Sequence, residues 1–146
     1  MIQRIQTIYL AIALICMGLT LIFPFSTYGD IEFNAMGFNN DFSIASSYPL
    51  IYNIIVSTIL SLLAIFSFKN RKNQQLINKL NFVVILILLV VMFIDFNYFQ
   101  SIPMLNENVS YGIGMFLPIV ALVSLIMAYR AIKSDEDLIK SMDRIR

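Results

Sequence analysis

Four long apolar runs divide this chain of 146 residues and constrain its fold more than any other feature. They cover about residues 5–25, 49–68, 80–99 and 111–129, and each approaches the ~20 residues that a helix needs to cross ~30 Å of hydrocarbon. Because lipid leaves no water for unpaired backbone groups, helices are the only reasonable spanning elements. The pattern predicts an all-α membrane protein, a four-transmembrane-helix bundle forming a single domain over residues 1–146.

The lysines and arginines predict the orientation of these spans. All ten precede the first run, lie between the second and third, or follow the fourth, whereas segments 26–48 and 100–110 contain acidic residues and no basic one. Excess Lys and Arg in short loops marks the cytoplasmic side. We therefore expect both termini in the cytoplasm and a belt of aromatic residues at the outer level. The belt residues are Phe23, Phe25, Tyr28, Tyr48, Tyr52, Tyr98, Phe99 and Tyr111.

The first outer segment contains the only strand-like pattern. Apolar and polar residues alternate over 31–35 and again over 42–44, with Gly37, Asn39 and Asn40 between them. These turn residues tolerate positive φ, so one interpretation is a short periplasmic β-hairpin over 30–44, and the other is an irregular polar loop. An isolated hairpin is marginal in water, so it would have to pack on the bundle, the lipid surface or a partner.

Small residues predict how the helices pack. Helix association in lipid depends on close packing, which small residues on one face allow. Two such stripes occur, Ser57, Ser61 and Ala64 in the second span and Ala121, Ser124 and Ala128 in the fourth. We expect these two helices to pack together through their small faces, the third to expose more of itself to lipid or another protein, and Pro118 to kink the fourth.

Polar residues inside the spans are few. Asp95 lies about one turn below the outer end of the third span, Asn53 lies at a similar depth in the second, and Asn81 near the inner end of the third predicts a helix–helix contact. A carboxylate in hydrocarbon is costly to ionise. Asp95 is therefore either a protonatable site in a transport path or an interfacial carboxylate that is hydrated or hydrogen-bonded.

No cluster of residues in the chain suggests catalysis. There is no His, and the single Cys16 falls within the first run. Paired carboxylates, Cys/His clusters, a phosphate-binding glycine loop and a nucleophile elbow are absent from the sequence. We expect no enzyme activity, no catalytic residue, no cofactor and no metal site. The basic stretch 69–72 predicts a topology anchor rather than a nucleic-acid site, and it would attract anionic lipid at the cytoplasmic face.

The cytoplasmic tail, residues 130–146, has amphipathic spacing. Residues 134–137 either cap a new helix or continue the fourth one, with acidic residues where a helix dipole favours them. The apolar stripe predicts a short amphipathic cytoplasmic C-terminal helix that lies on the bilayer or docks on a partner, the alternative being a solvated end that only holds topology. The candidate partner-binding residues are Leu138, Ile139, Met142, Arg144, Ile145 and Arg146.

The two ends of the chain also carry recognisable motifs. These are residues 1–7 with Tyr9, the basic turn 69–72, residues 116–118, Ala128, residues 130–132, 135–136, Leu138, residues 143–144 and Arg146. In these features the chain resembles an uncharacterised family of the Bacteroidota phylum, the domain-of-unknown-function family numbered four-two-nine-three. The resemblance spans the whole chain and implies a four-helix protein of the bacterial inner membrane, without catalytic residues to carry over.

Three functions follow as hypotheses. The first is a non-enzymatic inner-membrane protein, an accessory or structural subunit of a larger membrane complex, which contacts another membrane protein or copies of itself through its helices and cytoplasmic tail. The alternative is a small oligomeric transporter or channel that uses Asp95. A membrane enzyme is the weakest hypothesis, because the polar clusters that it would need are missing from the sequence.

Overall fold

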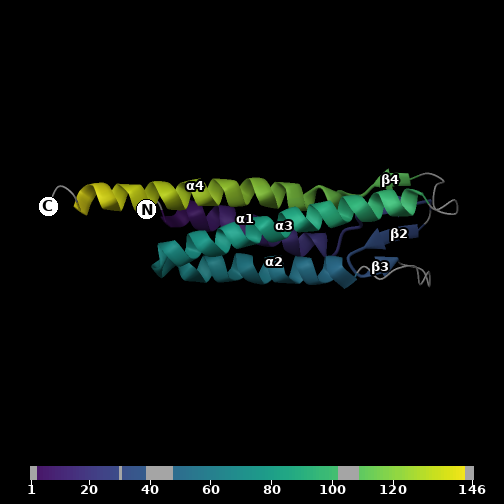
Figure 1. Cartoon of the computed structure of the whole chain (residues 1–146), viewed down its shortest axis with the longest axis horizontal. Helices are drawn as coiled ribbons and strands as arrows, with labels where there is room; N and C mark the ends of the chain where they lie inside the picture. The colour runs from purple at the N-terminus through teal and green to yellow at the C-terminus, as the bar shows by residue number, and fades with distance from the viewer. Residues whose placement is uncertain (1–2, 30, 39–47, 102–108, 144–146) are drawn as a thin grey trace.

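Four helices form an elongated bundle in the computed structural model, which describes residues 3–29, 31–38, 48–101 and 109–143. Within these residues the helices are α1 (Gln3–Thr20), α2 (Tyr48–Phe66), α3 (Arg71–Gln100) and α4 (Leu117–Asp143). They run side by side along the long axis of the molecule (Figure 1). α1 packs mainly against α4 and α2 mainly against α3, with smaller α1–α2 and α3–α4 contacts. The prediction that four helices pack into a bundle is confirmed.

Two of the helices are long and apolar enough to cross a membrane. They are α3 and the segment Ile113–Ile139, which contains most of α4, whereas the apolar parts of α1 and α2 are shorter, at Ile5–Thr20 and Leu50–Phe66. Only 28% of the most apolar window of α3 and 33% of that of α4 is buried in the bundle. Most of each window is thus not buried in the bundle, and the expected contrast in exposure between the third and fourth helices is slight.

A small antiparallel sheet lies at the end of the bundle opposite the two chain termini (Figure 1). It contains β1 (Ser26–Tyr28), β2 (Ile31–Asn34), β3 (Gly37–Phe38) and β4 (Val109–Tyr111), in the order β3-β2-β1-β4. The predicted strand at 31–35 is confirmed as β2, but β2 pairs with β1 and β3. The predicted second strand at 42–44 lies outside the described residues. β4 follows α3 in the sequence, so the sheet joins the α1–α2 connection to the α3–α4 connection.

Aromatic side chains fill the space between this sheet and α3. The ring centroid of Phe99 lies 4.9 Å from that of Phe33 and 6.2 Å from that of Tyr28. Phe25, Tyr28 and Phe99 are buried, so the prediction that these three belong to an interfacial belt is wrong. They belong instead to the buried hydrophobic core. The exposed members of the predicted belt are Phe23, Tyr52, Tyr98 and Tyr111, and the side chain of Tyr48 is not described.

Two glycines bring the exit of α1 against the entry of α4. The Gly112 N–H donates to the carbonyl of Phe25 at 2.8 Å, and the Gly114 N–H donates to that of Pro24 at 2.9 Å. A Cβ atom at Gly112 would lie 2.1 Å from the Pro24 oxygen. This approach between backbones excludes any side chain at that position.

Pro118 lies in the first turn of α4 rather than inside it. A short 3₁₀ turn, Ile113–Met115, precedes the helix, and the Phe116 carbonyl accepts from the N–H groups of Ile119 and Val120 at 3.1 and 3.2 Å. In the first turn a proline removes no helical hydrogen bond, since that N–H would have no partner. The predicted kink within the fourth helix is therefore wrong, because the helix begins at Leu117.

Candidate functional site

Three polar side chains of α3 are buried towards the end of the bundle where the chain terminates. Gln74, Asn78 and Asn81 are spaced by four and three residues, so they share one face of the helix. Buried polar groups in folded proteins nearly always have hydrogen-bond partners. Each of the three accordingly fixes α3 to a neighbouring helix.

Asn81 connects α3 to α2. It accepts a hydrogen bond from the Ser57 hydroxyl and donates one to the Ser61 hydroxyl, both at 2.7 Å. The predicted helix–helix contact of Asn81 is confirmed. The Gln74 amide extends the same interface by donating to the carbonyl of Ala64 at 3.0 Å. The prediction that α2 packs on α4 through this small-residue stripe is wrong, because the serine hydroxyls meet polar partners on α3.

The small-residue stripe of α4 leads to α1. Ala121, Ser124 and Ala128 are buried, and the same face continues to Asp135. The buried Gln6 amide of α1 donates to the Asp135 carboxylate and, at 3.3 Å, to the Ala131 carbonyl. Sequence reasoning missed Gln6 because it stands at the start of an apolar run, where a polar side chain is ordinarily exposed. The sequence signal for Gln6 is its spacing: the buried Leu10 and Ala13 follow it by four and seven residues, so all three share one face of α1.

α4 continues without a break into the predicted tail. It ends at Asp143, so residues 134–137 extend the fourth helix rather than cap a new one. Leu138 and Ile139 are 50% and 39% exposed. The Gln75 amide of α3 donates to the Glu136 carboxylate at 2.7 Å. Among the other candidate partner-binding residues, the side chain of Met142 and all of Arg144, Ile145 and Arg146 lie outside the described part of the structure.

Asp95 lies near the sheet, at the opposite end of α3 from Gln74, Asn78 and Asn81. It is half-buried, as is Asn53 on α2. Burial raises the pKa of the Tyr28 phenol, and the negative charge of Asp95 raises that pKa further. The buried face of α3 between Asp95 and Asn81 consists of apolar residues, Ile85, Leu88 and Met92. Along this described face, no polar path joins the two ends of the bundle.

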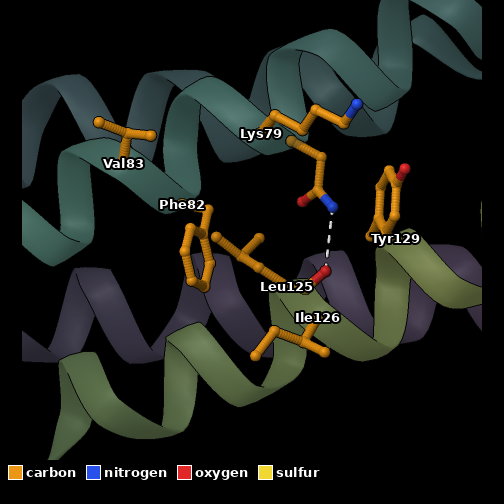
Figure 2. A pocket seen from close by; sticks show the side chains of 7 residues that line it. Lys79, Phe82, Val83, Leu125, Ile126 and Tyr129 are labelled. Atoms are coloured by element: carbon orange, nitrogen blue, oxygen red, sulfur yellow. Dashed lines mark hydrogen bonds between the residues drawn. The ribbon is translucent and has the colours of Figure 1, made fainter.

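A groove between α3 and α4 opens next to the buried Asn78 (Figure 2). Its volume is about 380 Å³, and its walls are Phe82, Val83, Leu125 and Ile126. Lys79 and Tyr129 lie together at one end (Figure 2), with the Lys79 ammonium 5.3 Å from the centroid of the Tyr129 ring. The groove thus combines apolar walls with one cation.

Asn78 gives the groove a polar lining on the side of α3. Its amide nitrogen donates to the Leu125 carbonyl at 2.9 Å, the bond dashed in Figure 2. Its Oδ1 atom is buried and has no hydrogen-bond partner among the described residues. The described residues also contain no group of three or more Cys, Asp or Glu side chains able to hold a metal ion.

A comparison with protein families identifies one match. A family model described as "Domain of unknown function (DUF4293)" matches residues 2–145, which is almost the entire chain. No curated protein and no solved structure matches. The predicted family is thereby confirmed, whereas the expected phylum stays a prediction.

Proposed function

Because this chain belongs to the DUF4293 family, whose description assigns no activity, we propose its function from its own surfaces. We propose a non-enzymatic integral membrane protein that serves as an accessory or structural subunit of a larger membrane complex. In this proposal all four helices cross the bacterial inner membrane and both termini are cytoplasmic. The partner is another membrane protein, contacted through exposed helix faces and the end of α4.

Exposed apolar rows on all four helices support the membrane placement. Ile8, Ile59, Val90 and Val123 represent one helix each, and all are at least half exposed. Large contiguous apolar patches are unusual on soluble monomers. α1 and α2 contain 18 and 19 residues, which at 1.5 Å per residue gives roughly 27–29 Å, close to the ~30 Å hydrocarbon thickness. The one-sided distribution of Lys and Arg supports cytoplasmic termini.

Cysteine labelling tests this topology. In a Cys16→Ser background, which removes the single native thiol, Met36→Cys places a thiol at the 80% exposed turn between β2 and β3. Lys72→Cys places a matched, exposed thiol at the start of α3. A membrane-impermeant maleimide added to intact spheroplasts should label the first variant at once and the second only after lysis. Labelling of Lys72→Cys before lysis, or of neither variant after it, would contradict the topology.

The end of α4 is the single observation that carries the subunit proposal. Figure 1 shows α4 extending past the corresponding ends of the other three helices. The contact of Gln6 with Asp135 fixes the course of α4 just before this extension. Leu138 and Ile139 follow this contact on the same continuous helix, and both are exposed. An apolar pair held rigidly in this way favours a helix-in-groove contact with a partner.

A pull-down in mild detergent at native expression tests the contact. The variant Leu138→Gln, Ile139→Gln changes two exposed residues to good helix formers and leaves Asp135 in place. The matched control is Ser134→Gln, Asp137→Gln, an exposed polar pair on the preceding turn. A stoichiometric membrane partner should be retained by the wild type and the control and lost from the apolar-pair variant. Purification of the wild-type chain alone would refute the subunit function.

The transporter or channel alternative has weaker support. Asp95 lies at the sheet end, and Ile85, Leu88 and Met92 separate it from the polar residues of α3. A four-span monomer with one shallow carboxylate offers few of the paired intramembrane groups that proton paths use.

A further inference from the structure

We propose that the groove between α3 and α4 binds one anionic phosphodiester lipid whose headgroup donates a hydrogen bond to Asn78. This inference rests on the membrane placement proposed above, and it adds a ligand and a site. The lipid phosphate would lie at Lys79 and Tyr129, its headgroup hydroxyl at Asn78, and an acyl chain along the apolar walls.

Lys79 supplies the charge complementarity. Its side chain is exposed, its ammonium lies over the Tyr129 ring, and no described carboxylate forms an ion pair with it. Lys79 immediately precedes the apolar surface that begins at Leu80. In the proposed topology it therefore lies at the cytoplasmic headgroup level, where lysine side chains extend toward lipid phosphates.

Asn78 supplies the polar selectivity. The side chain is only 2% exposed, and its Oδ1 atom lacks a donor among the described residues. Such an unpartnered buried oxygen is rare in folded proteins. A phosphate oxygen accepts hydrogen bonds and cannot supply one, and neither can a choline group. A headgroup that bears a hydroxyl can, and an anionic lipid of this kind matches both Lys79 and Asn78.

The walls of the groove favour a lipid over free phosphate. Phe82, Val83, Leu125 and Ile126 present apolar surface next to the polar end. The volume of about 380 Å³ falls within the range of small-molecule sites, and it exceeds what a phosphate group alone would fill. Exposed apolar residues also occur farther along both helices, at Val90 on α3 and Val123 on α4.

Native mass spectrometry of the purified full chain tests the site. The protein is offered phosphatidylglycerol, phosphatidylmethanol and phosphatidylcholine with identical acyl chains, and inorganic phosphate separately. We expect one retained phosphatidylglycerol and several-fold less phosphatidylmethanol, which has the same charge and no headgroup hydroxyl. Phosphatidylcholine and inorganic phosphate should not be retained. Equal retention of the three lipids, or tight binding of inorganic phosphate, would overturn the proposal.

Exposed lysines provide matched variants. Lys79→Gln should lower retention of phosphatidylglycerol about tenfold, because a hydrogen bond to a charged group is lost. Lys79→Arg should restore it. Lys72→Gln, seven residues earlier on the same face of α3 and outside the groove, should bind like the wild type. Equal loss in both glutamine variants would overturn the site, and the labelling of Met36→Cys and Lys72→Cys tests the membrane placement independently.

Discussion

The contact of Asn81 with Ser57 and Ser61 should stabilise the pairing of α2 with α3 by an amount that a double-mutant cycle can measure. Both hydrogen bonds are 2.7 Å long, and all three residues are fully buried. Interhelical hydrogen bonds measured in a membrane protein average about 0.6 kcal/mol and reach about 1.7 kcal/mol. Short, buried bonds belong in the upper part of this range. We expect a coupling of about 1 kcal/mol between Asn81→Ala and Ser57→Ala.

The coupling stays modest because serine has another acceptor within its own helix. In this bundle the Thr58 hydroxyl donates to the carbonyl of Ile54 at 2.8 Å, and that of Ser124 donates to Val120 at 2.9 Å. Ser57 can turn to the carbonyl four residues earlier in the same way when Asn81 is removed. The Ser57 hydroxyl is then not left unsatisfied, so at this residue Asn81→Ala avoids the larger desolvation cost of an orphaned polar group.

The assay is equilibrium unfolding in mixed micelles with increasing dodecyl sulfate, followed by circular dichroism. Free energies of unfolding are compared for the wild type, the two single variants and the double variant. A parallel cycle pairs Asn81→Ala with Thr58→Ala, whose hydroxyl bonds within α2, and it should be additive within about 0.5 kcal/mol. If the Ser57 cycle is as additive as this control, the interhelical bond contributes nothing and the reasoning is wrong.

Further outcomes are expected at four residues. Gly112→Ala should lower the free energy of unfolding by more than about 1 kcal/mol, because the added Cβ meets the Pro24 carbonyl. Gly18→Ala, inside α1, should raise the free energy of unfolding by about 0.5–1 kcal/mol, because the added Cβ meets nothing within 4 Å. The same micelle titration measures both. Asp95→Asn should leave the pull-down partner unchanged, and loss of the partner would refute that expectation. The pKa of Tyr28 is raised in the fold, so the folded state keeps the phenol proton to higher pH than the unfolded state does. Stability should therefore fall as pH rises above about 10. Tyr28→Phe should flatten that fall in thermal melts across pH 8–11.

The helices could be predicted because their signal is local. The length of each apolar run and the spacing of buried residues such as Leu88 and Met92 are properties of single segments. The predicted pairing of α2 with α4 was wrong, because Ser57 and Ser61 form only one side of an interface and do not identify the helix on the other side. Their partner is Asn81 of α3. A single sequence does not show whether α3 or α4 is the neighbour of α2.

The sheet and the groove were harder to predict from the sequence, for related reasons. β1 and β4 have three residues each, which is too few for an alternation of apolar and polar residues to be recognised. Pro118 indicates a kink only if the start of the helix is already known. Lys79 and Tyr129 are 50 positions apart in the sequence, and only the crossing of α3 and α4 brings them to one groove.

The pairing of β1 with β4 has a consequence for the order in which the chain matures. Thr27 and Ser110 meet across the sheet although they are 83 residues apart in the sequence. During synthesis β4 does not exist until α3 is complete, so β1 has an open edge through most of translation. Contacts of such long range form slowly, and open edges attract strands of other molecules. Closure of the sheet is therefore a late step, and a chain halted before residue 109 exposes β1 to exchange with its neighbours.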